Sequence, residues 1–185
     1  MKTILRQIAN IQTGIFAKPI TEGEIVYLQA KHFDENGQLI GSLHPDLNAE
    51  GISDKHLLQP GDILFAAKGT KNFATVFESH NIPSVASTSF FVIRLQGKNV
   101  MPEYLAWFLN HPASQKFLKG KAIGTSIASI SKAVLEELEI LIPDLQTQKA
   151  IFKISQLRNV EIKLKHQIEA LREKQIQQQI INAIK

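Results

Sequence analysis

Cysteine is absent from this sequence of 185 residues. Its absence excludes disulfide frameworks, thiolate zinc sites and cysteine nucleophiles, so the protein has no need of an oxidising compartment. Long apolar runs are also missing. None approaches the roughly 18 residues of a membrane span, and the first residues lack the sustained apolar stretch of a signal peptide. We therefore expect a cytoplasmic protein without a membrane partner.

Motifs typical of common enzymes and of metal or nucleotide sites are absent as well. The six histidines show neither an HExxH pattern nor another close metal-ligand spacing, and no GxSxG, P-loop or GxGxxG sequence occurs. Asp144 and Glu161 occur in a sequence pattern similar to a nuclease signature. However, they lie on one predicted helix about 25 Å apart, which is too far for the two carboxylates to bind one metal ion. We predict no catalytic residue, no metal site and no cofactor.

Short β-branched and aromatic segments, separated by Gly, Pro and Asn turns, occupy the first hundred residues. The predicted strands lie within 1–12, 25–29, 63–67, 73–77 and 138–142, with one long or two short strands within 83–95. After Pro102 the apolar spacing becomes helical, and short helices are predicted over 103–109, 113–119 and 132–138. We expect an α+β fold with a β-rich domain over residues 1–143.

A single long helix is predicted within residues 144–185. Apolar residues recur there three to five positions apart, and after Pro143 neither glycine nor proline interrupts them. A helix of about 40 residues is about 60 Å long, far longer than one small domain can cover. Its apolar residues must therefore meet another helix, in a partner chain or in a second copy. The candidate partner-binding residues are Leu157, Val160, Leu164, Ile168, Leu171, Ile176 and Ile180.

The net charge of +4 is unevenly distributed. Basic and acidic side chains cancel over residues 1–142, so the whole excess lies in residues 143–185. Between Ser79 and Leu135 the only acid is Glu103, whereas the basic residues there are Arg94, Lys98, Lys116, Lys119, Lys121 and Lys132. A locally positive face on a nearly neutral domain suits contact with phosphates. A solvated lysine surface is the alternative interpretation.

Two polar loops are candidates for contact with double-stranded DNA. The first separates two predicted strands and combines ammonium groups with side chains able to bind base edges. Its candidate residues are Lys68, Thr70, Lys71 and Asn72. The second offers hydroxyls and backbone amides next to lysines. Its candidate residues are Lys119, Lys121, Gly124, Thr125, Ser126 and Ser129. For each loop alone, the alternative is that its polar residues only stabilise a turn. The presence of both loops in one domain, together with the basic segment between Ser79 and Leu135, favours DNA binding.

Several segments in this order resemble the DNA specificity subunits of type I restriction-modification systems. The resemblance covers nearly the whole chain and depends on order and spacing more than on any single motif. The segments are Ile8-Ala-Asn-Ile-Gln-Thr-Gly14, Leu58-Gln-Pro-Gly-Asp-Ile-Leu-Phe65 with Lys68-Gly69, Ser87-Thr-Ser-Phe-Phe-Val-Ile93, Pro102-Glu-Tyr-Leu105, Gly124-Thr125 with Ile130, and Leu138, Ile140, Ile142-Pro143 and Gln148.

The resemblance implies a target-recognition domain over residues 1–143 and a helical region over residues 144–185 that docks methyltransferase subunits. In this family two recognition domains together read a bipartite DNA sequence. Partner subunits methylate adenine or, with a restriction subunit, translocate and cleave the DNA. This sequence holds one recognition domain and one helix. A homodimer whose helices pair antiparallel would restore the missing half and read a split palindromic site.

Other interpretations stay open at this point. A half-size subunit and a fragment of a longer subunit would give the same sequence. A DNA-binding regulator such as a repressor would bind its operator without a methyltransferase subunit. A non-catalytic assembly or decoy subunit would form the complex but show no sequence preference.

Overall fold

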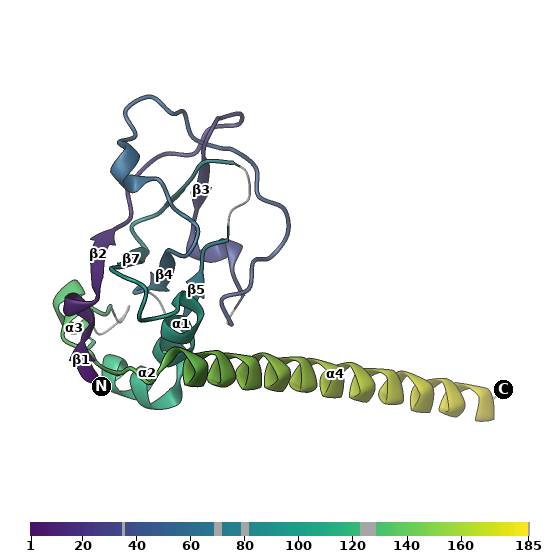
Figure 1. Ribbon diagram of the computed structural model, residues 1–185. Helices are drawn as coiled ribbons and strands as arrows, with labels where there is room; N and C mark the ends of the chain where they lie inside the picture. The colour runs from purple at the N-terminus through teal and green to yellow at the C-terminus, as the bar shows by residue number, and fades with distance from the viewer. Residues whose placement is uncertain (35, 69–71, 79–81, 123–128, 185) are drawn as a thin grey trace.

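A four-stranded antiparallel sheet forms the centre of the protein. The computed structural model describes residues 1–185 except 35, 69–71, 79–81, 123–128 and 185. The sheet consists of β2 (Ala9–Thr13), β4 (Ile63–Ala66), β5 (Ala74–Val76) and β7 (Phe90–Leu95). The order across it is β2-β7-β4-β5. It lies inside a body that we define as residues 1–143, from which one helix extends (Figure 1).

Both faces of this sheet are buried. In β4, Ile63 and Phe65 face one apolar cluster, whereas Leu64 and Ala66 face another. Successive side chains of a strand point to opposite faces, so a strand covered on both sides must be apolar at every position. All four residues of β4 are buried, which confirms the prediction of a buried strand at 63–67.

A small parallel pair covers one face of the sheet. It is formed by β3 (Val26–Leu28) and β6 (Ser84–Ala86), with Tyr27 opposite Val85. The segment 83–95 therefore gives two strands, β6 and β7, rather than one long strand. Two short 3-10 helices, η2 (Ala30–His32) and η3 (Asp54–His56), lie in the connections. This layer packs on the cluster that includes Leu28, Phe73 and Phe90.

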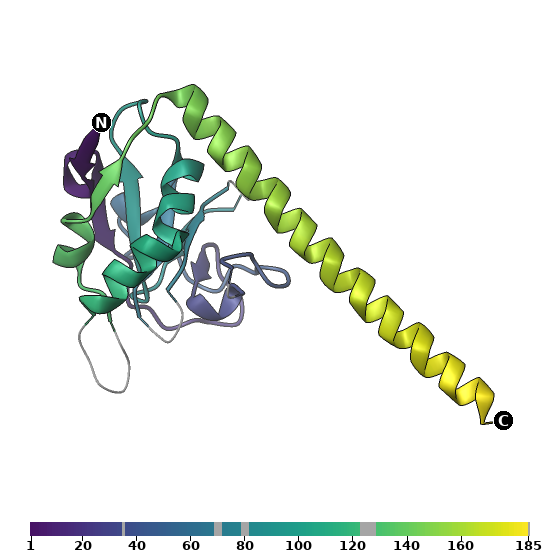
Figure 2. The same cartoon turned by 90° about the horizontal axis from the view of Figure 1, so that it is seen from below.

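Three short helices lie on the opposite side of the sheet (Figure 2). They are α1 (Pro102–Asn110), α2 (Pro112–Gly120) and α3 (Lys132–Glu136). Asn110 at the end of α1 takes the place of a neighbouring strand for the edge strand β5. Its Oδ1 accepts from the Ala74 N–H at 2.7 Å, and its Nδ2 donates to the Ala74 carbonyl at 2.7 Å. The amide thus satisfies backbone groups that an open edge would leave unpaired.

The beginning of the body is tied to its end. β1 (Lys2–Ile4) pairs antiparallel with β8 (Glu139–Leu141), and Thr3 lies opposite Ile140. Sequence reasoning placed one strand within residues 1–12, but the structure has two, separated by the 3-10 helix η1 (Leu5–Gln7). Leu5 is fully buried in this turn. The turn redirects the chain, so that β1 joins β8 while β2 joins β7.

The predicted long helix is present as α4 (Leu145–Ala183), a single α-helix of 39 residues. It begins after Pro143 with Asp144 as its N-cap, whose Oδ1 accepts from the Thr147 N–H at 2.9 Å. At 1.5 Å per residue the helix is about 59 Å long. Figure 1 shows it leaving the body in a straight line, with the C-terminus far from the β-strands. Both parts of the α+β expectation, the β-rich body and the long helix, are confirmed.

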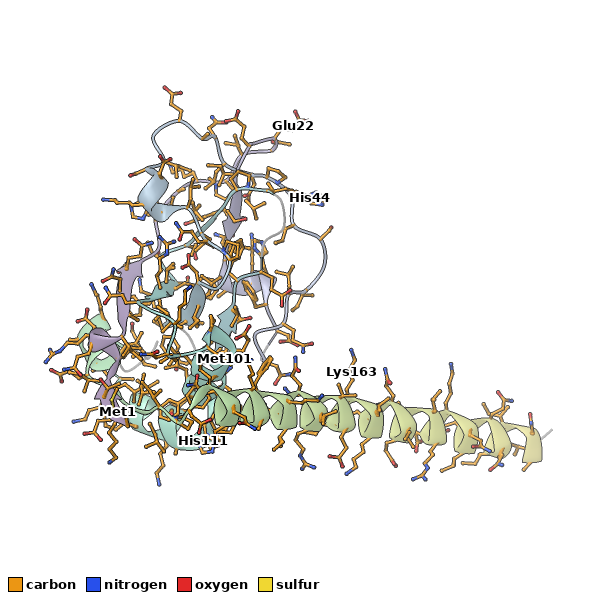
Figure 3. All side chains as sticks on the ribbon, in the orientation of Figure 1. Met1, Glu22, His44, Met101, His111 and Lys163 are labelled. Atoms are coloured by element: carbon orange, nitrogen blue, oxygen red, sulfur yellow. The ribbon has the colours of Figure 1, made fainter. Side chains whose placement is uncertain are left out.

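One buried glutamine fixes the first turn of α4 to the body. Gln148 is fully buried. Its Oε1 accepts from the Met101 N–H at 2.9 Å, and its Nε2 donates to the carbonyls of Asn99 and Pro143, both at 2.9 Å. Figure 3 shows Met101 directly above the start of α4. One side chain thereby joins the segment before α1, at Asn99 and Met101, to the start of α4.

Beyond this joint, α4 is exposed to solvent. From Gln156 to Ile184 its residues make little contact with the body. Within the described part of the chain, none of the helices is both long enough and apolar enough to cross a membrane. The exposed apolar side chains of α4 therefore need another explanation.

One of the expected surface charges, Arg94, is paired with a buried carboxylate. Arg94 on β7 contacts Asp62 through Nε at 2.8 Å and through Nη2 at 2.6 Å, and Nη2 also donates to the Leu57 carbonyl at 3.0 Å. The Asp62 side chain is only 2% exposed. The hydrogen bond from the guanidinium to Asp62 raises the pKa of Arg94. Arg94 therefore compensates an interior carboxylate, and its charge is already neutralised within the protein.

Replacing Gln148 with leucine should destabilise the protein. Leucine fills a similar volume but removes the hydrogen-bond partner of the carbonyls of Asn99 and Pro143 and of the Met101 N–H, which we expect to lower the free energy of unfolding by about 3 kcal/mol. Urea unfolding followed by the fluorescence of Trp107 measures this change. The matched control is Gln146→Leu, an exposed position in the same turn. Equal losses in the two variants would contradict the role given to Gln148.

Replacing Arg94 with methionine should destabilise the body by about 3 kcal/mol, because Asp62 would remain as an uncompensated buried charge. Thermal and urea unfolding report this effect. Lys98→Met removes the same charge from an exposed neighbouring position and should leave stability nearly unchanged. If Lys98→Met were as damaging as Arg94→Met, net charge rather than the ion pair would be responsible.

Candidate nucleic-acid interface

The first candidate loop follows the buried strand β4 and is closed at its base. Ala66 donates its N–H to the Phe73 carbonyl at 2.8 Å, and the Asn72 Nδ2 donates to the Ala66 carbonyl at 2.8 Å. Lys68 is exposed. Thr70 and Lys71, predicted to contact DNA, lie outside the described residues. Asn72 uses its amide nitrogen to close the loop, a structural task that sequence reasoning did not assign to it.

The second candidate loop begins at the end of α2 and is anchored by two buried side chains. Leu118 is fully buried in α2, and Ile130 is 1% exposed on the far side of the loop. Lys119 and Lys121 are exposed at the end of α2. Gly124, Thr125 and Ser126 lie outside the described residues, whereas Ser129 is half-buried.

The two loops meet. Lys68 and Ser129 form an isolated antiparallel β-bridge, and the Ile130 N–H donates to the Ala67 carbonyl at 2.9 Å. Ala67 in turn donates its N–H to the Ser89 carbonyl at 3.0 Å. Residues about sixty positions apart in the sequence are therefore neighbours at one site. Sequence reasoning named both loops but carried no signal that would have joined them.

Fewer unpaired basic side chains lie near this site than the sequence indicated. Of the six basic residues between Ser79 and Leu135, Arg94 is committed to Asp62. Lys132 forms an ion pair with Glu136 at 3.4 Å within α3. The other four are exposed lysines, and Lys119 and Lys121 are the pair next to the second loop. Together with Lys68 they give the joined loops three ammonium groups, which suits a phosphate backbone.

Ser87 belongs to the interior and not to this surface. It is 4% exposed, and a Cβ on Gly14 would lie only 2.1 Å from its carbonyl oxygen. Only glycine permits such a close approach of β2 to the end of β6. Direct contact between the Ser87 side chain and DNA is therefore excluded by packing.

The two acidic residues of the nuclease-like sequence pattern, Asp144 and Glu161, have structural roles. Asp144 caps α4, and its hydrogen bonds from Thr147 lower its pKa. Glu161 contacts Lys165 at 2.6 Å and Arg158 at 2.9 Å, and these hydrogen bonds lower its pKa. Both acids lie on one straight helix. Among the described residues, no group of three or more histidine, aspartate or glutamate side chains gathers into a possible metal site.

The predicted partner-binding residues of α4 are all exposed but do not share one side. Successive residues of an α-helix are rotated by about 100°. One set faces the direction of Leu164 to within about 40°, and we call it the central stripe. It consists of Leu157, Val160, Leu164, Ile168 and Leu171, each between 49% and 67% exposed. The distal stripe consists of Ile176, Ile180 and Ile184, and it lies on the opposite side.

An open groove of about 580 Å³ separates the body from the first turns of α4. Trp107 on α1, Thr75 on β5, and Phe152 and Ser155 on α4 contribute to its walls. Sequence reasoning missed this groove because its walls come from distant segments. Phe152 and Ser155 point toward the body, so the body lies on the side of α4 opposite the central stripe.

Comparisons with known proteins agree on one family. The model of the type I restriction modification DNA specificity domain matches residues 5–174. The specificity subunit of the type I restriction enzyme MjaVIII from Methanocaldococcus jannaschii is 33% identical over 81 residues, which are 43% of this chain and 19% of that protein.

Solved structures share the fold. The S subunit of the type I restriction-modification system of M. genitalium has a TM-score of 0.60 at 17% identity, over 88% of this chain and 40% of its own. The HsdS subunit from Thermoanaerobacter tengcongensis has a TM-score of 0.62 at 16% identity, over 90% and 39%. A structure concerned with complex assembly and conformational transition of the type I R-M system has a TM-score of 0.65 at 16% identity, over 90% and 40%.

This chain thus spans less than half the length of the relatives that it matches. At 16–17% identity the structural likeness shows the fold alone. The family model, in contrast, matches most of the chain and covers both the body and much of α4. The chain belongs to the type I restriction modification DNA specificity domain family.

Proposed function

We propose that this chain is a DNA-reading specificity subunit of a type I restriction-modification system. The observation that carries the proposal is the bridge between Lys68 and Ser129, which joins two polar loops beside the exposed Lys119 and Lys121. Such a site offers ammonium groups for phosphates and loop groups for base edges. Family membership supports the same function.

In this proposal the chain has two parts with different tasks. Residues 1–143 form the target-recognition domain, and residues 144–185 form the helical region that pairs with a second copy and docks methyltransferase subunits. A restriction subunit is a further possible member of the assembly. The chain itself performs no catalytic step, and adenine methylation and cleavage belong to its partners. The structural tasks of Asp144 and Glu161 support this division.

Pairing of α4 with the helix of a second copy follows from its exposed apolar side chains. Leu164 and Ile168 are 52% and 49% exposed in the single chain. Apolar side chains arranged along a helix are stabilised by burial against another helix. A dimer of this kind would carry two recognition domains and could read a split palindromic site.

The deciding experiment combines the chain with a type I methyltransferase subunit from the same genome and maps adenine methylation on DNA exposed to the complex. Methylation at a symmetric split motif supports the proposal. A stable complex without methylation would favour a decoy subunit. Tight binding to one DNA sequence with no methyltransferase binding would favour a free-standing regulator.

Phosphate contact by the joined loops can be tested without knowing the target sequence. Replacing both Lys119 and Lys121 with glutamine should weaken binding to a mixed-sequence duplex roughly tenfold and reduce the slope of log affinity against log salt by about 2. Fluorescence anisotropy over a salt series measures both values. Lys18→Gln, which removes an exposed lysine between β2 and β3, is the control. An unchanged slope in the double variant would remove these lysines from the interface.

Pairing through α4 predicts that assembly can be disrupted while the body stays folded. Replacing Ile168 and Leu171 with aspartate should abolish both dimerisation and methyltransferase docking, because charged groups cannot be buried in an apolar seam. The body should stay folded, since neither residue contacts it. Light scattering measures the mass, and circular dichroism with Trp107 fluorescence checks the fold. A dimer that survives both substitutions would show that the helices do not pair through this region.

A further inference from the structure

The groove between the body and α4 has walls from two helices. The wall from α1 carries Glu103, Ala106, Trp107 and Asn110, and the wall from α4 carries Phe152, Ser155, Gln156 and Asn159. Both sets are spaced by three, one and three positions, so each wall is one face of its helix. Figure 1 shows α1 and the edge strand β5 beside the first turns of α4. The groove therefore opens along the edge of the central sheet.

The floor of the groove contains an open strand edge. In β5 and its flanks, Phe73 and Phe77 are hydrogen-bonded to the neighbouring strand segment at 2.8 and 2.7 Å. Backbone groups of a strand alternate in direction, so those of Ala74 and Val76 point outward from the sheet. Asn110 binds the N–H and the carbonyl of Ala74. No residue that the structure describes is hydrogen-bonded to the backbone of Val76, which lines the groove.

A smaller cavity of about 220 Å³ lies on the other face of β5. It shares five lining residues with the groove, namely Gly37, Gln38, Thr75, Val76 and Glu78. Its other lining residues are apolar, namely Leu28, Phe33, Leu39, Leu64 and Phe77. Because successive side chains of a strand point to opposite faces, an extended chain beside Val76 would direct its side chains alternately into the groove and into this cavity.

Side-chain amides are frequent in the groove. The described lining residues that carry one are Asn36, Gln38, Asn72, Asn110, Gln156 and Asn159. An amide both donates and accepts, which matches the alternating N–H and carbonyl groups of a peptide chain. Asn72 and Asn110 already bind backbone groups of this chain in that way. Gln156 and Asn159 are exposed on α4 and can bind the backbone of an incoming chain.

The charge of the groove is negative. Glu78 and Glu103 line it, and none of the described lining residues is a lysine or an arginine. Lys163, one turn beyond Asn159, is labelled in Figure 3 and lies outside the groove. This lining disfavours the phosphates of a nucleic acid and favours basic side chains.

We propose that the groove binds an extended, basic peptide segment of a partner protein, which adds as a strand to the Val76 edge of β5. The backbone of the segment pairs with Val76 and with the amides of Gln156 and Asn159. Every second side chain is a lysine or arginine that enters the groove toward Glu103 and the ring of Trp107, which attracts a cation. The intervening apolar side chains enter the cavity of about 220 Å³. The inference goes beyond the proposed function, because it requires neither DNA nor pairing of α4.

A capped synthetic peptide of four Leu-Lys repeats is the probe, and Trp107, the only tryptophan, reports its binding. The titration should give a saturable change in fluorescence. Two further peptides carry N-methyl groups on every leucine or on every lysine, so each is blocked along one backbone edge. One of these two, and a Leu-Glu peptide of opposite charge, should bind at least about tenfold more weakly. The proposal fails if the Leu-Lys peptide does not bind saturably, if both methylated forms bind as well as it does, or if the Leu-Glu peptide does.

Val76→Pro tests the strand edge in the protein itself. Proline removes the N–H that the segment would use, and because this N–H points away from β4, the body should stay folded. Binding of the Leu-Lys peptide should fall at least about tenfold. Val76→Thr keeps the N–H and the β-branched shape, and as the matched control it should bind normally. Circular dichroism checks the fold of both variants, and the methylated peptides decide the question if Val76→Pro does not fold. Unchanged binding by Val76→Pro, or an equal loss in both variants, would overturn strand addition.

Discussion

The buried amide of Gln148 is the contact on which the geometry of this protein depends. A helix of 39 residues that touches its own chain only in its first turns has no fixed direction unless those turns are held rigidly. Gln148 holds them through the Met101 N–H and the carbonyls of Asn99 and Pro143. Because the side chain is fully buried, each of these bonds is protected from water, and its loss leaves an unpaired polar group behind. The pairing of β1 with β8 also fixes the segment that leads into α4.

The central sheet places the candidate DNA surface in a similar way. Burial on both faces fixes β4 and β7, and Asn110 closes the β5 edge, so the loop after β4 starts from a rigid position. The bridge from Lys68 to Ser129 then brings the second loop to the first. Charge counts along the sequence overstated this surface, because Arg94 neutralises the interior carboxylate of Asp62. In the proposed interface the remaining positive charge is that of the three exposed lysines, Lys68, Lys119 and Lys121.

Local patterns in the sequence predicted the elements well where a single period dominates. The apolar run at β4, the helical spacing after Pro102 and the uninterrupted helix after Pro143 all appear in the structure. Pairings between distant segments were not predictable, because no local signal links β1 to β8 or Lys68 to Ser129. The loops of the candidate site were found by composition, yet their contact was not. The apolar residues of α4 were identified from their spacing alone. That spacing does not reveal that Ile176 and Ile180 lie on the side of the helix opposite Leu164.

The joint at the start of α4 also bears on the proposed function. If two copies pair antiparallel through α4, the direction that Gln148 gives to each helix sets where the two bodies lie relative to each other. Because such a pair has two-fold symmetry, the joined loops of the two copies would face DNA in opposite orientations, with a separation that depends on the length of α4. A split site with inverted halves is the target that the proposed dimer would read.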